Sequence, residues 1–137
     1  GYRRTTDGGE TWTEIEDELS DEFEGADKIF GLTQDRLGGT ILMRSEYGIL
    51  RSSDQGESWE HVDLLTSPGE VTVWSAALDP DDADTIYYGT EDIFYTTTSG
   101  GDAWQTEDLP SGRVPKTMIV HPEDTQYVLT GFAAVED

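Results

Sequence analysis

The feature that most constrains the fold is an eight-residue segment that occurs three times. It reads TTDGGETW at residues 5–12, SSDQGESW at 52–59 and TTSGGDAW at 97–104. Its tryptophans are separated by 47 residues, from 12 to 59, and by 45 residues, from 59 to 104. A fixed period of this size is typical of an array in which each copy is one supersecondary unit.

A second marker repeats between these segments with nearly the same period. Leu78–Asp82 precedes the strand-like run Thr85–Gly89, and 42 residues later Val120–Asp124 precedes Tyr127–Gly131. Two markers with one period predict an all-β chain whose repeats are four-stranded antiparallel blades of a β-propeller.

The strand-like runs divide the chain into two complete blades and two half blades. We predict one propeller segment over 1–137, made of an outer half blade (1–16), two blades (28–62 and 71–106) and an inner half blade (114–137). The acidic stretch Asp17–Asp27 is interpreted as a solvated connection, with a helix as the lesser alternative. The strands are expected at Tyr2–Thr5, Thr11–Ile15, Ile29–Thr33, Thr40–Arg44, Gly48–Ser52, Ser58–Val62, Thr72–Leu78, Thr85–Gly89, Ile93–Thr97, Ala103–Thr106, Thr117–Val120 and Tyr127–Gly131.

Each repeated segment is predicted to be a tight turn that satisfies its own polar groups. An aspartate carboxylate can accept backbone N–H groups of its turn, and a glycine can adopt the positive φ that a tight turn requires. The tryptophan that follows is expected to bury its ring and anchor the blade. The residues assigned to this structural role are Asp7, Gly9, Thr11 and Trp12, then Asp54, Gly56, Ser58 and Trp59, then Ser99, Gly101 and Trp104.

The pattern S/T-x-D-x-G-x-S/T-W resembles the Asp box of the BNR-type propeller families. These include sialidases, sortilin-type receptor domains, xyloglucanase-type glycoside hydrolases and proteins similar to photosystem II assembly factors. The first two copies match fully. The third has Ser99 in place of aspartate and Ala103 in place of serine or threonine, so its turn is expected to be held less firmly by side-chain hydrogen bonds.

Charge narrows the range of partners. The chain has 30 acidic and 8 basic residues, for a formal net charge of -22, and only two lysines, Lys28 and Lys116. This balance argues against nucleic-acid binding and against docking on anionic membranes. Because the acid is spread through turns, we interpret it as adaptation to high salt, as in haloarchaea. A face that binds cations or a basic partner is the alternative.

No catalytic, cofactor-binding or metal-binding residue is assigned. His61 and His121 lie far apart in the repeat, and the acidic run 79–84 lacks the glycine and distal glutamate of an EF-hand loop. Arg113-Val114-Pro115 echoes a sialidase motif too weakly to predict that site. The aromatic residues Trp74, Tyr87, Tyr88, Phe94 and Tyr95 are expected to pack mainly between blades, with ligand stacking as the alternative.

The sequence therefore predicts a non-catalytic scaffold that binds an unknown protein or glycan, without nucleic acid and without membrane insertion. The alternative is a fragment of a sialidase-like or xyloglucanase-like glycoside hydrolase whose catalytic residues lie elsewhere. Because a propeller needs about 4–8 blades, the remaining blades are expected from a longer chain. A second copy could also supply them, if two chains complete a six-bladed ring.

Overall fold

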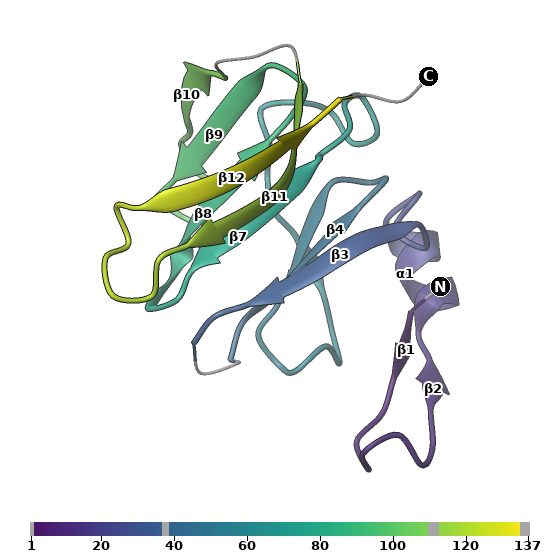
Figure 1. Cartoon of the computed structure of the whole chain (residues 1–137). Helices are drawn as coiled ribbons and strands as arrows, with labels where there is room; N and C mark the ends of the chain where they lie inside the picture. The colour runs from purple at the N-terminus through teal and green to yellow at the C-terminus, as the bar shows by residue number, and fades with distance from the viewer. Residues whose placement is uncertain (1, 37–38, 110–112, 135–137) are drawn as a thin grey trace.

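The computed structural model describes residues 2–36, 39–109 and 113–134 (Figure 1). Residues 1 and 135–137, at the ends of the predicted half blades, lie outside this range. The elements are β1 (Arg3–Arg4), β2 (Thr13–Glu14), α1 (Glu16–Glu22), β3 (Ile29–Gln34), β4 (Ile41–Ser45), β5 (Ile49–Ser52), β6 (Glu60–His61), β7 (Ser75–Asp79), β8 (Asp82–Gly89), β9 (Ile93–Thr97), β10 (Gln105–Asp108), β11 (Val114–Val120) and β12 (Val128–Ala133).

The strands form two four-stranded antiparallel sheets and two hairpins. The sheets have the orders β3-β4-β5-β6 and β7-β8-β9-β10, and the hairpins are β1-β2 and β11-β12. In each sheet every strand pairs with its neighbour in the sequence, so both sheets are simple meanders. The predicted all-β architecture is confirmed.

The first strands of successive units lie beside one another. β3 contacts β7, and β7 contacts β11, so these three strands form a common inner edge (Figure 1). The hairpin β1-β2 corresponds to the outer strands β5 and β6 of the first complete sheet, because each of these strand pairs flanks an Asp box. This placement of inner and outer strands is the propeller arrangement.

The strand that follows each repeated turn begins later in the structure than the sequence analysis predicted. Residues 58–62 and 103–106 were expected to be extended, but β6 begins at Glu60 and β10 at Gln105. Likewise β2 begins at Thr13 instead of Thr11. In all three copies the first strand residue directly follows the tryptophan, because the residues before it are held in the turn by its hydrogen bonds.

The main hydrophobic core lies between the two sheets. Tyr88 is completely buried and stacks on Tyr95, with ring centroids 4.2 Å apart and an interplanar angle of 2°. Burying each such ring removes a large apolar area from water, which stabilises the sheet pair. The other buried members of this cluster are Leu42, Ile49, Val62, Val73, Leu78 and Ile86.

The interpretation of Asp17–Asp27 as a solvated connection is wrong. Glu16–Glu22 forms the helix α1, and Leu19 and Phe23 are buried against the outer face of the first sheet. The ring of Phe23 meets Tyr47 edge-on at 5.2 Å. The i, i+4 spacing of Leu19 and Phe23 provides the apolar stripe that this packing needs. No helix in the described residues has the length and apolarity needed to cross a membrane.

Candidate functional site

The two complete Asp boxes have the same hydrogen-bond pattern. Asp7 Oδ1 accepts the backbone N–H of Thr11 at 2.9 Å, and the Thr11 hydroxyl donates to Asp7 Oδ2. In the second box, Asp54 Oδ1 accepts the N–H of Ser58 at 2.8 Å, and the Ser58 hydroxyl donates to Asp54 Oδ2. These donors, foremost the hydroxyl, lower the pKa of each aspartate to about 2. Both carboxylates are occupied within their own turns.

A hydroxyl that our sequence reasoning did not assign lies at the centre of each turn. The first residue of the box accepts the N–H of the box glycine, at 2.9 Å from Thr5 to Gly9 and 2.8 Å from Ser52 to Gly56. The Thr5 hydroxyl also donates to Asp7 Oδ1 at 2.8 Å. The sequence does contain a signal for this role, because the first position of the box is serine or threonine in all three copies.

The third box keeps part of this pattern with a shorter side chain. Ser99 Oγ accepts the N–H of Ala103 at 3.0 Å, as the aspartate does in the other boxes. Thr97 Oγ1 accepts the N–H of Gly101 at 3.1 Å. Ala103 has no hydroxyl, so the side-chain link that closes the other two turns is missing here.

Each turn contains two successive residues in the left-handed region. The assigned glycines Gly9, Gly56 and Gly101 have φ values of 97°, 85° and 105°. The residue before each of them is also left-handed, and in the second box it is Gln55, with φ of 63°. This position was not predicted, because it carries glycine in only two of the three copies.

The prediction that all three tryptophans anchor a blade by burial is wrong for Trp12. Its side chain is 58% exposed, whereas that of Trp59 is 8% exposed and that of Trp104 is half-buried. Trp59 meets the ring of Tyr2 edge-on at 5.6 Å, and Trp104 meets Tyr88 at 5.0 Å. The difference has a simple cause: in the described residues no sheet precedes the β1-β2 hairpin and covers Trp12.

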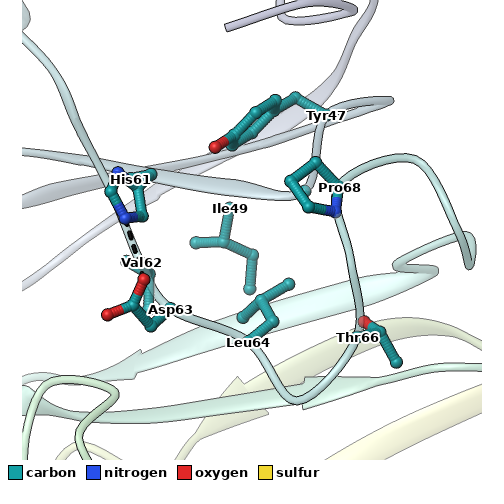
Figure 2. A pocket seen from close by; sticks show the side chains of 9 residues that line it. Tyr47, Ile49, His61, Val62, Asp63, Leu64, Thr66 and Pro68 are labelled. Carbon is teal, nitrogen blue, oxygen red and sulfur yellow. Dashed lines mark hydrogen bonds and ion pairs between the residues drawn. The ribbon is translucent and has the colours of Figure 1, made fainter.

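A small hollow of about 270 Å³ opens beside the end of β6 (Figure 2). Its floor is apolar, and on one side His61 Nε2 lies 2.8 Å from Asp63 Oδ1. Both side chains are mostly exposed. Among the hydrogen bonds of the described residues, none links His61 to a nucleophile, and no group of three or more metal-ligating side chains occurs in that part of the chain.

A second surface, on the inner strands, has a different character. Two adjoining hollows of about 300 and 500 Å³ open there, and Arg44 and Lys116 line both of them. Lys116 Nζ lies 4.3 Å from the centre of the Trp74 ring, and the Arg44 guanidinium lies 5.7 Å from that of Phe30. We call these four residues, together with Ser75 on the floor of the smaller hollow, the inner-face patch.

The inner-face patch is free of acidic residues in a strongly acidic chain. None of the residues that line the two hollows is aspartate or glutamate, although 30 of the 137 residues are acidic. Arg44 donates to the backbone oxygens of Val73 and Phe30, at 2.9 and 3.2 Å, and burial lowers its pKa. The patch therefore concentrates positive charge that no carboxylate in its lining neutralises.

Ser75, beneath this patch, carries a buried hydroxyl. Its side chain is 3% exposed, and its hydroxyl has no partner in the described part of the molecule. A buried polar atom without a partner costs about 1–3 kcal/mol. Of the aromatic residues weighed in the sequence, Tyr88 and Tyr95 pack in the core, whereas Trp74 lines the patch.

The sheets, the shared inner edge and the three repeated turns define the class of the molecule: it is a segment of an Asp-box type β-propeller. No protein-family model matches the sequence, and no curated protein matches it either.

Solved structures share the fold. The GH74 enzyme of Niastella koreensis superposes with a TM-score of 0.66 and 13% identity, over 93% of this chain and 23% of that one. An ancestral GH74 enzyme gives 0.66 and 15%, over 94% and 18%. YCF48 bound to D1 peptide gives 0.54 and 17%, over 72% and 33%. The chain thus spans a third or less of the length of each of these proteins.

Proposed function

We propose that the chain is a non-catalytic propeller segment, organised as one unit over residues 1–137, that binds an acidic segment of a partner protein through its inner-face patch. The observation that carries the proposal is the acid-free lining around Arg44 and Lys116. In a chain with a formal net charge of -22, a pair of cations without carboxylates around them attracts anionic groups selectively.

The chemistry of the patch suits a carboxylate on a peptide. Lys116, held over the Trp74 ring, offers a mobile ammonium, and the fixed guanidinium of Arg44 adds positive charge. The exposed ring of Phe30 offers an apolar contact beside them. The similarity to YCF48, a propeller solved with a peptide bound, supports this choice of ligand class.

The two lysines of the chain provide a matched test. Lys116→Glu reverses a charge in the patch, whereas Lys28→Glu changes a lysine that is paired with Glu46 at 2.9 Å and lines neither hollow. Fluorescence anisotropy would measure the binding of labelled 12-residue Asp/Glu-rich peptides, with Asn/Gln-rich peptides as neutral counterparts. We expect Lys116→Glu to weaken binding of the acidic peptides at least tenfold and Lys28→Glu to leave it within twofold.

Two results would overturn the proposal. One is equal loss in both variants, which would show that the overall charge sets the affinity. The other is no preference for the acidic over the neutral peptides. The same assay is repeated with oligogalacturonate, an acidic sugar. Tight binding of this sugar without binding of the acidic peptides would show that the partner is a glycan and not a protein.

The second candidate is a fragment of a glycoside hydrolase-like protein with its catalytic residues elsewhere. The similarity of the chain to two GH74 enzymes over more than nine-tenths of its length favours this possibility. Assays with fluorogenic glycosides on the longest natural form of the protein separate the candidates. Turnover that is lost when single carboxylates are replaced would establish the enzyme.

A further inference from the structure

The hollow beside the end of β6 is held in shape by packing on two sides (Figure 2). Ile49 and Leu64, in its floor, belong to the hydrophobic core that the first sheet shares with the second. On its other side, the ring of Phe23, which directly follows α1, meets Tyr47 at 5.2 Å and His61 at 6.3 Å. The lining is therefore fixed by neighbours within this chain, as in a preformed binding site.

This hollow has the size and lining for one long side chain. Its volume of about 270 Å³ is below the roughly 300–1,000 Å³ of pockets that enclose a whole small molecule. Figure 2 shows Pro68 across from the pair His61 and Asp63, with Ile49 and Leu64 between them. An apolar floor with a carboxylate at one end suits lysine, which lays its stem along apolar surface and keeps its charged head at a polar group.

The carboxylate of Asp63 is available for such a head group. Its Oδ1 lies 2.8 Å from His61 Nε2, and no hydrogen bond of the described residues uses Oδ2. The side chain is mostly exposed, so a ligand can reach it from the solvent. The backbone oxygen of Asp63 accepts the indole N–H of Trp104 at 2.7 Å, which fixes the position of the residue.

An acidic hollow of about 470 Å³ adjoins this one, and Tyr47 lines both. Glu22, Glu24 and Glu46 line the acidic hollow, and neither lining contains a lysine or an arginine. Lys28, from outside the lining, pairs with Glu46. The surface next to the apolar floor therefore attracts further positive charge.

We infer that these two hollows bind a basic segment of a partner protein, with one lysine side chain in the smaller hollow and its ammonium on Asp63. The neighbouring basic residues of the segment face the glutamates of the acidic hollow, where opposite charges attract. This site shares no residue with the inner-face patch.

Two variants that remove the same charge separate the hollow from the overall acidity of the chain. Asp63→Asn changes the carboxylate of the hollow, whereas Asp102→Asn changes an exposed one that lines neither hollow. Fluorescence anisotropy would measure binding of a labelled 12-residue Lys/Ser peptide in 1 M KCl, where a Debye length of about 3 Å screens distant charges. We expect Asp63→Asn to weaken binding at least fivefold and Asp102→Asn to leave it within twofold, both with unchanged circular dichroism spectra.

The length of the stem provides a second test. A peptide with diaminobutyrate in place of lysine carries its charge on a shorter stem, so it should bind at least fivefold more weakly, and an acetyl-lysine peptide should not bind. Equal affinity of the two variants, equal binding of the two cationic peptides, or undiminished binding of the acetylated one would overturn the inference. Since the test of the inner-face patch changes Lys116 and this one changes Asp63, either proposal can fail without the other.

Discussion

At the scale of single residues, the Asp box is stabilised by side-chain acceptors that are used inside the turn. Asp54 receives the N–H and the hydroxyl of Ser58, and Ser52 receives the N–H of Gly56. A carboxylate engaged in this way already has its hydrogen-bond donors within its own turn. This supports the structural role assigned to the box aspartates from the sequence.

Gln55 is the residue at which we expect a single substitution to stabilise the protein. Its φ of 63° is left-handed, which costs a residue with a Cβ atom about 1–2 kcal/mol, and glycine stands at this position in the other two boxes. Gln55→Gly should raise the free energy of unfolding by up to about 1 kcal/mol, after the loss of chain entropy is subtracted. Urea denaturation in 2 M KCl measures it.

Glu57→Gly is the control for this substitution. It lies two residues further along the same turn, where the backbone is not left-handed. Glycine there should lower the stability, by roughly 0.5–1 kcal/mol. If both variants lost stability to the same extent, the backbone conformation of Gln55 would not be strained.

At the scale of elements, the three turns differ in how completely they are closed, and the third can be repaired. Ser99→Asp with Ala103→Ser would restore the hydroxyl–carboxylate hydrogen bond that the other boxes contain. We expect the double variant to gain about 1 kcal/mol in urea denaturation, the usual net contribution of one hydrogen bond. Each single substitution should gain much less, because the bond needs both groups. Additive single effects would contradict this account.

The helix α1 is a second case in which the packing of an element decides its structure. Its sequence is dominated by acidic residues, so composition suggested a solvated connection. Leu19 and Phe23 decide the outcome, because the first sheet offers them an apolar face next to Tyr47. Helix formation there depends on tertiary packing more than on local propensity.

At the scale of the whole molecule, the charge of -22 should make folding depend on salt. The Debye length shrinks from about 10 Å at 0.1 M to about 3 Å at 1 M, so added salt screens the mutual repulsion of the carboxylates. We expect the β-sheet circular dichroism signal to be lost below about 0.5 M KCl and regained above it. Full retention of the signal at 0.05 M would contradict adaptation to salt.

The sequence by itself determined the repeat, the strand order and the chemistry of the turns. These features are local: the hydrogen bonds that the serine, threonine and aspartate side chains of a box make within its turn join residues no more than four apart, so a short motif encodes them. It could not determine that Trp12 is exposed while Trp59 is buried, because both motifs are alike and only their neighbours in space differ.

Only the tertiary structure brought the inner-face patch together. Phe30, Arg44, Trp74 and Lys116 come from three different repeats and carry no motif. They converge because β3, β7 and β11 share an edge, and strand alternation turns these side chains to one surface. Local rules encode the turn, whereas a surface built from distant strands exists only after the blades have packed.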